Sequence, residues 1–314
     1  MIRRIIGGIV RRIRNIHPDI NKKLKKSNWY HRLFPHLYEY ERLKQGADVL
    51  CIGSTPAKNA LDFTNIEQIR GYNLAVCPET IYYDFQVLKN YHSFLKPGGI
   101  ILFVLCPFTF LKDFYRNEFG SKSYLNIRYY PILHRAMIDT FSEDLYHKYV
   151  EEPILIDKKA WARLFYDPIS PNSLKIDNNP QTSTESIELC KQRVKSWMRE
   201  FHMLDLNPNH IPETIEKAIK GNIKIFQDMK DFIEERGYKA YIIIPPFPEE
   251  MTSLLPDDLV KHNLIDPVKE TGIPYINFYG VEEWLSRELY YHGFLLNAHG
   301  RELFTKVVLS RISL

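Results

Sequence analysis

The sequence has few cysteines, and no two of them have a spacing typical of metal or redox motifs. The four are Cys51, Cys77, Cys106 and Cys190, with no C-x-x-C pair among them. This pattern argues against a structural zinc site and a disulfide framework, and we expect neither a metal ion nor another cofactor. Three of the four lie on or beside segments predicted to be core strands, where a free thiol behaves as a small apolar residue. The cysteines therefore favour a reducing compartment.

The sequence also lacks a long apolar run and any internal repeat. Near the N-terminus the uncharged stretch Ile5–Val10 is too short for a signal-peptide core and far too short to span a bilayer. We therefore expect no export and no transmembrane segment, and a cytoplasmic location. The sequence does not indicate an oligomeric state.

Basic residues are concentrated at the N-terminus. The net charge is +4, yet residues 1–30 hold nine Lys or Arg and a single acidic residue, Asp19. The rest of the chain therefore carries a slight negative charge. Because nucleic-acid binding leaves a basic footprint across a domain, we expect no nucleic-acid partner.

Residues 1–16 have the pattern of a basic amphipathic helix, with apolar residues at helical spacing and arginines over much of the remaining surface. Such a helix suits the interface of an anionic membrane, with its apolar face in the lipid boundary. Two alternatives stay open: the apolar stripe packs on the protein itself, or the arm binds RNA, which the regular stripe disfavours. The stripe consists of Ile2, Ile5, Ile6, Ile9, Val10 and Ile13.

Short apolar runs alternate with helical patterns along the chain. This alternation predicts an α/β fold of three α/β/α layers with a mainly parallel sheet. Ligands of such sheets bind beyond the carboxyl ends of the strands, so we expect one pocket there, built from three segments. The expected strands are 47–52, 73–76, 100–105, 240–244 and 273–278, and the residues expected at their carboxyl ends include Gly53, Ser54, Thr55, Cys77, Pro107 and Phe108.

A length of 314 residues fits one α/β domain with an insertion. We expect a basic arm and aromatic linker over residues 1–45 and the α/β domain over residues 46–314. A helical insertion at about residues 110–236, rich in Tyr, Phe and Trp, interrupts that domain and is expected to cover the strand ends. The aromatic and histidine residues of 29–40 can stack on sugars or bases, although a small satellite core is the favoured interpretation.

Three blocks, in order, resemble those of the SGNH/GDSL hydrolase superfamily. They are Gly53-Ser54-Thr55 after the first strand, Asn73-Leu74-Ala75 as an N-L-G-type block, and a closing Leu296-Asn297-x-x-Gly300. The chain is most similar in style to superfamily proteins of bacterial capsule and exopolysaccharide gene clusters. The resemblance implies a flavodoxin-like fold. It also implies an esterase or O-acyltransferase acting on a glycan or its lipid-linked precursor, at the inner face of the membrane or in the cytoplasm.

The resemblance also implies a degenerate catalytic triad. In the superfamily the third residue of the first block is the nucleophile, and that position holds Thr55. The histidine and aspartate positions of the closing block hold Leu295 and His292. A hydroxyl nucleophile needs a base, and one arrangement restores it, with Ser54 or Thr55 as nucleophile and His292 as base. His299 is another candidate base, but it is more simply a surface residue at a helix start.

The hydrogen-bond donors that form the oxyanion hole in the superfamily are also changed, which again argues against catalysis. Ala75 replaces the second-block glycine and still offers its backbone N–H, whereas the third-block asparagine has no counterpart at residues 106–109. Losing one such donor costs about 3 kcal/mol of transition-state stabilisation. We place Ala75 and Asn297 in the expected pocket. Two hypotheses follow, an acyl-ester enzyme and a catalytically inactive protein that binds glycan or a partner enzyme.

A further segment suggests a third, minor hypothesis. Lys96-Pro97-Gly98-Gly99 before an apolar strand resembles a late motif of S-adenosylmethionine-dependent methyltransferases. Those enzymes have a Gly-rich loop after the first strand, and Thr55-Pro56-Ala57-Lys58 is not such a loop.

Overall fold

The computed structural model describes residues 20–77, 80–111, 123–139, 141–157, 187–200 and 213–312. It divides the chain into two compact units, one of residues 1–41 and 122–177 and the other of residues 42–121 and 178–314. The amphipathic pattern at residues 1–16 lies outside the described residues. Within them, no helix is both long enough and apolar enough to cross a membrane.

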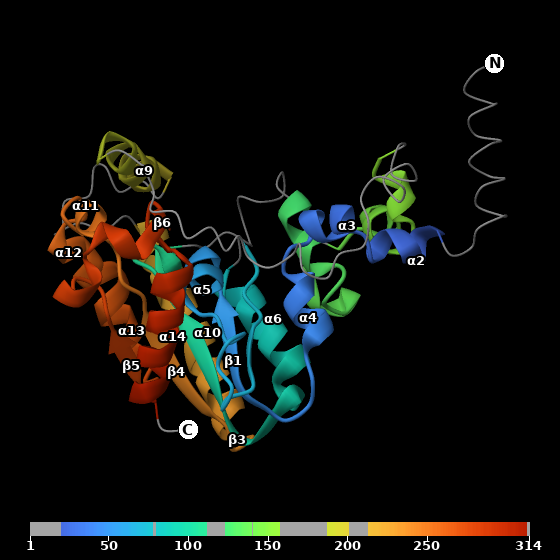
Figure 1. Cartoon of the computed structure of the whole chain (residues 1–314), viewed down its shortest axis with the longest axis horizontal. Coiled ribbons are helices and arrows are strands. Elements are labelled where there is room, and N and C mark those ends of the chain that lie inside the picture. The colour runs from blue at the N-terminus through green and yellow to red at the C-terminus, as the bar shows by residue number, and fades with distance from the viewer. Residues whose placement is uncertain are drawn as a thin grey trace. The chain divides into compact units, whose positions relative to one another are not determined.

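A five-stranded, wholly parallel sheet forms the centre of the second unit (Figure 1). In the strand order β2-β1-β3-β4-β5, successive strands are added first to one side of β1 and then to the other, so the switch point lies between β1 and β3, the usual ligand position in flavodoxin-like sheets. The predicted α/β class with a parallel sheet is confirmed. The strands are β1 Ala47–Gly53, β2 Gly71–Asn73, β3 Leu95–Val104, β4 Lys239–Ile244 and β5 Tyr275–Asn277.

Helices cover both faces of the sheet, as the alternating side chains of buried strands require. On one face, α5 (Thr55–Ala60) and α14 (Ala298–Arg311) share an apolar core with the strands that includes Val49, Leu102 and Phe304. The opposite face carries α6 (Ile81–Tyr91) and α10 (Glu213–Glu234). There the rings of Phe103 and Phe226 lie 5.4 Å apart, edge to face. The sheet is therefore the middle of three layers.

The remaining elements of the second unit lie between β3 and β5 or after β5 in the chain. An antiparallel hairpin of β6 and β7 precedes α14 and brings β7 beside α5. The bounds are α9 Ile187–Glu200, α11 Glu249–Thr252, α12 Asp257–Val260, α13 Asp266–Glu270, β6 Tyr290–His292 and β7 Leu295–Leu296.

The first unit has a small core of its own. Among its described residues, the α-helices are α2 (Ile20–Lys25), α3 (Asn28–Leu33), α7 (Glu143–Tyr146) and most of α4 (Leu37–Arg42). Trp29, Tyr30 and Phe34 are buried, and the Tyr30 hydroxyl donates to the Tyr149 carbonyl at 2.8 Å. The predicted satellite core of aromatic residues is therefore confirmed, because these rings pack inward.

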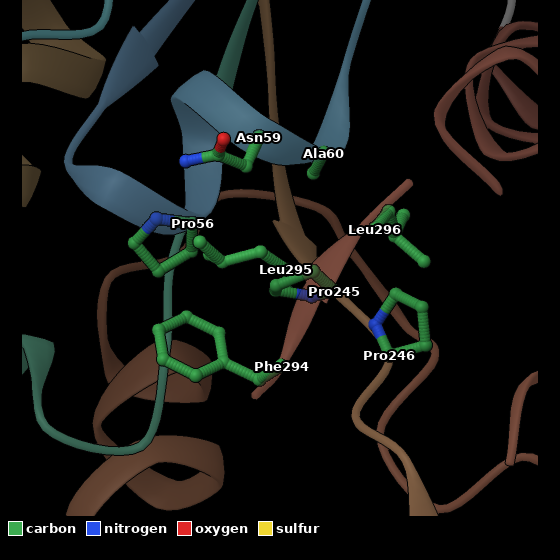
Figure 2. Close-up of a pocket in the computed structure, with 8 residues that line it drawn as sticks. All are labelled: Pro56, Asn59, Ala60, Pro245, Pro246, Phe294, Leu295 and Leu296. Atoms are coloured by element: carbon green, nitrogen blue, oxygen red, sulfur yellow. The ribbon is translucent and has the colours of Figure 1, made fainter. Parts of the chain in front are cut away.

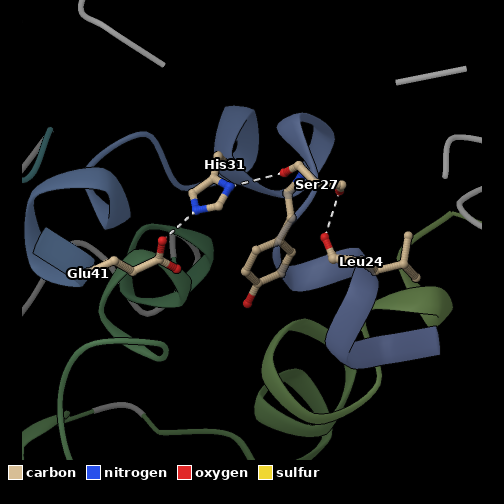
Figure 3. A network of polar contacts seen from close by, with 5 residues as sticks. Leu24, Ser27, His31 and Glu41 are labelled. Atoms are coloured by element: carbon tan, nitrogen blue, oxygen red, sulfur yellow. Dashed lines mark hydrogen bonds and ion pairs between the residues drawn. The ribbon is translucent and has the colours of Figure 1, made fainter. Parts of the chain in front are cut away.

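A polar network closes this core around His31 (Figure 3). His31 is buried, and its Nδ1 lies 3.1 Å from the Ser27 carbonyl while its Nε2 lies 3.1 Å from Glu41 Oε2. The hydrogen bond with Glu41 raises the pKa of His31, although burial opposes this. The Ser27 hydroxyl donates to the Leu24 carbonyl at 2.6 Å and not to the ring. The group is therefore a structural clamp and not a nucleophile–base pair.

Candidate functional site

The chain turns sharply from β1 into α5 at Gly53. Its φ of +140° is one that glycine adopts readily. A Cβ at this position would lie 2.8 Å from Ala57 Cβ and 2.9 Å from the Val104 carbonyl oxygen. The turn therefore requires glycine, and it places Ser54 at the N-cap and Thr55 as the first residue of α5, next to the end of β3.

Neither predicted nucleophile contacts a base among the described residues. Ser54 is 8% exposed, and its side chain makes no capping bond to α5. The Ser54 carbonyl accepts from the Lys58 N–H at 3.0 Å, and the Thr55 carbonyl accepts from Asn59 Nδ2 at 2.8 Å. Both residues thus contribute backbone acceptors to α5. An activated hydroxyl needs a base within hydrogen-bond reach, and the described side chains supply none.

The predicted base, His292, is placed only by its backbone. It ends β6, opposite Leu295 in the hairpin. Its side chain lies outside what the structure describes, so its role as base stays a prediction. His299 is in the first turn of α14 and exposed, as its interpretation as a surface residue at a helix start predicts.

The second block is held together by the Asn73 side chain. Asn73 is buried, and its Nδ2 donates to the carbonyls of Ala57 at 2.9 Å and Leu61 at 2.8 Å. Its Oδ1 accepts from the Ala75 N–H at 3.2 Å. The amide therefore fastens β2 to α5. The N–H that the resemblance assigns to an oxyanion hole is engaged with this side chain.

The closing block has an equally local explanation. Asn297 is the N-cap of α14, where its Oδ1 accepts from the Gly300 N–H at 2.9 Å. Its Nδ2 donates to the Glu288 carbonyl at 2.6 Å, so the side chain also fixes the preceding loop. A Cβ at Gly300 would overlap the Leu289 carbonyl oxygen. Asn297 is thus committed to folding the helix start, and the glycine three residues later allows the loop to pack on it.

The residues predicted after β2 and β3 are largely interior. Cys77 is half-buried, whereas Pro107 and Phe108 are buried, with Phe108 only 3% exposed. The turn they belong to is fixed by a 2.9 Å hydrogen bond from the Cys106 N–H to Thr109 Oγ1. These side chains therefore pack inside the unit at the end of β3.

A pocket does lie at the carboxyl edge of the sheet, but its lining differs from the prediction (Figure 2). The hollow spans about 210 Å³ when open solvent is included, and its enclosed part has room for little more than one water molecule. It is therefore far smaller than the sites of about 300–1,000 Å³ that enclose drug-sized ligands. Its walls come from α5, from the segment after β4 and from the β6–β7 hairpin, and they are Pro56, Asn59, Ala60, Pro245, Pro246, Phe294, Leu295 and Leu296.

Two features of this lining were present in the sequence without being assigned to a pocket. Pro245 and Pro246 directly follow the strand expected at residues 240–244, and Leu295 occupies the histidine position of the resemblance. A proline pair directly after a buried strand was the available signal, because the carboxyl ends of parallel strands meet at one edge. Leu295, at the histidine position of the resemblance, lines the pocket as an apolar wall.

The charges around the site are sparse. None of the eight lining side chains is ionisable, and Asn59 is the single one with a polar group. Among the described residues, no group of three or more His, Cys, Asp or Glu is arranged to hold a metal ion. The site consists of an apolar pocket beside two hydroxyls that lack a described base. Comparison of the sequence with protein-family models found no match, and comparison with curated proteins found none either.

Proposed function

We propose that this protein is a catalytically inactive, SGNH-like protein that binds glycan at the carboxyl edge of its sheet. The observation that carries the proposal is the position of Leu295. The residue that takes the place of the general base in the resemblance is an apolar wall of the pocket. A leucine accepts no proton, so a nucleophile at Ser54 or Thr55 would depend on a base from elsewhere.

The engagement of the Ala75 N–H supports the same conclusion. An oxyanion hole works by preorganised donors that point at the developing charge. Here that donor already bonds to Asn73, whose other two hydrogen bonds hold α5. Freeing the N–H would require rotating a buried amide away from three partners. A transition state would therefore gain little from it.

A second candidate function is the acyl-ester enzyme, esterase or O-acyltransferase. One observation favours it: the Gly53 turn presents Ser54 at the end of β1 with a hydroxyl that bonds to no described residue. His292, whose backbone lies in the adjoining hairpin, would then act as base.

Labelling with a fluorophosphonate probe, followed by intact-mass analysis, separates the two functions. The folded wild-type protein is expected to gain no adduct, whereas a serine esterase labelled in parallel gains one. An adduct that disappears in Ser54→Ala or Thr55→Ala, and weakens in His292→Ala, would refute inactivity and establish the esterase. If S-adenosylmethionine raised the melting temperature instead, the methyltransferase hypothesis would replace both.

We further propose that the protein works in bacterial surface-polysaccharide synthesis at the inner face of the membrane. The support is the basic amphipathic pattern of residues 1–16. The full chain is expected to sediment with vesicles that contain anionic lipid and not with neutral vesicles. A chain lacking residues 1–16 should lose this binding, and equal binding by both chains would refute the assignment.

A further inference from the structure

Arg301 is the most deeply buried charged side chain that the structure describes, with 2% of the residue exposed. Its Nε and Nη1 are closed off from solvent, and neither has a hydrogen-bond partner among the described residues. A buried cation needs an opposite charge or hydrogen-bond acceptors to offset the hydration that it has lost. The two nitrogens therefore call for an acceptor that the described part of the chain does not supply.

The position of Arg301 in α14 adds to the positive potential. Arg301 belongs to the first turn of this helix of 14 residues, and helical side chains lean toward the N-terminus. The N-terminal end of a helix carries a partial positive charge, because its first N–H groups have no intrahelical acceptor. A cation is normally favourable at the other end of a helix. The start of α14 therefore suits a negatively charged ligand.

One carboxylate near Arg301 offsets the charge only in part. Burial lowers the pKa of Arg301, and the charges of Asp62 and Tyr291 oppose this shift. Asp62 nevertheless bonds to neither Nε nor Nη1. Its Oδ1 accepts from the Thr64 N–H at 2.9 Å, and its own N–H donates to Thr305 Oγ1 at 2.9 Å. Asp62 is thus held in place by other bonds and leaves the guanidinium without a direct partner.

The chemistry and the burial of the two nitrogens limit the ligand to a small anion. Nε and Nη1 only donate, so the ligand must accept from both and needs no donor of its own. A water molecule also accepts, but its two protons then require acceptors nearby. Because both nitrogens are closed off from solvent, a phosphate, a sulfate or a sugar carboxylate is too large. A chloride ion is little larger than a water molecule.

We infer that Arg301 and the start of α14 bind a chloride ion. The ion accepts hydrogen bonds from Nε and Nη1 and neutralises the buried guanidinium. It is a structural ion, which stabilises the first turn of α14 in the fold. The inference goes beyond the proposed function and does not depend on it.

Thermal unfolding of the full chain in sodium chloride and in sodium gluconate of equal ionic strength tests this inference. Gluconate is too large for the site, so chloride should raise the melting temperature of the wild type by about 3 °C relative to gluconate. Arg301→Met should lose this chloride-specific rise. In gluconate it should unfold at the wild-type temperature or above it, because it removes an unpaired buried charge.

Two further variants sharpen the test. Asp62→Asn keeps the shape of the side chain and removes a negative charge, so the rise should reach half its size at about fivefold less chloride. Arg311→Met is the matched control, since Arg311 is exposed at the far end of the same helix. It removes the same charge and should keep the rise. An equal effect of chloride on wild type and Arg301→Met would overturn the inference.

Crystals grown in bromide locate the ion directly by anomalous scattering. A peak within hydrogen-bond distance of both Nε and Nη1 supports the inference. An ordered water that bridges Arg301 to Asp62, without an anomalous peak, would overturn it. A peak without the chloride-specific rise would mean binding at crystal concentration only, which would also overturn it. If Arg301→Met fails to fold, the wild-type peak and the response of Asp62→Asn decide, and failure of either counts against the site.

Discussion

Asn73 is the side chain whose replacement most directly tests how the carboxyl edge is built. It makes three hydrogen bonds, to the carbonyls of Ala57 and Leu61 and from the Ala75 N–H, at 2.8 to 3.2 Å. The residue is 8% exposed, so water does not readily replace these bonds. Asn73→Leu keeps the approximate volume of the side chain and removes all three. Asparagine is therefore required here by hydrogen bonding and not by size.

The expected loss can be worked from the bonds. An intramolecular hydrogen bond contributes about 1 kcal/mol net, and a buried group left without a partner costs about 1–3 kcal/mol. The carbonyls of Ala57 and Leu61 can each still accept another hydrogen bond, so the cost of each lost bond lies toward the lower end of this range. We expect Asn73→Leu to lower the free energy of unfolding by about 3–5 kcal/mol, a large part of the 5–15 kcal/mol typical of a folded protein.

Urea unfolding followed by circular dichroism measures this difference. Asn65→Leu is the matched control, since Asn65 is exposed and the same change there should stay within about 0.5 kcal/mol of wild type. Asn73→Asp should be at least as destabilising as Asn73→Leu, because its second carboxylate oxygen would face two carbonyls. If Asn73→Leu lay within about 1 kcal/mol of the control, the amide would not hold β2 to α5.

Three further changes probe other parts of the chain. Gly300→Ala should cost about 3 kcal/mol by urea unfolding, because its Cβ would overlap the backbone carbonyl of Leu289; a cost below about 1 kcal/mol would contradict that close approach. Arg301 is 2% exposed with Nε and Nη1 unpaired among the described residues, and burial lowers its pKa, so Arg301→Met should leave the melting temperature unchanged or raise it. A marked fall would reveal a partner for the guanidinium. The raised pKa of His31 means that its bond with Glu41 stabilises the fold fully below pH 6.5 and less as pH rises through the folded pKa. The stability gap between wild type and Glu41→Gln should shrink accordingly, and a gap constant from about pH 5 to about pH 9 would refute this.

The boundaries of the elements were predicted unevenly, for identifiable reasons. The apolar run at 47–52 matched β1, because a buried parallel strand needs little but continuous apolar residues. The next strand was expected at 73–76, yet β2 spans Gly71–Asn73. Beyond Asn73 the backbone still bonds to β1, through Leu74 to Cys51 and Val76 to Gly53. The apolar pattern therefore identified the segment but not the point where regular pairing ends.

The start of the last helix was marked in the sequence by its N-cap residue, but the helix was predicted to begin too late. The amphipathic pattern of the sequence predicts a closing helix over residues 301–312, and α14 begins three residues earlier, at Ala298. Asn297 is a favourable N-cap, and the glycine three residues after it permits the loop to pack close. The same two residues had been interpreted as part of a catalytic block. Capping explains them without any chemistry.

The sequence by itself determined the layered parallel fold, because strand and helix periodicities are local and each apolar run must find a covered place in a sheet. It also indicated the turn at Gly53, because a glycine between a buried strand and a helix start is a local turn signal. Only the tertiary structure decided what the carboxyl edge presents. Pro56, Pro245 and Leu295 become neighbours through the strand order, and the Ala75 N–H is engaged because the Asn73 amide turns toward it. Side-chain orientation and contacts between distant segments depend on packing in three dimensions, which no local pattern encodes.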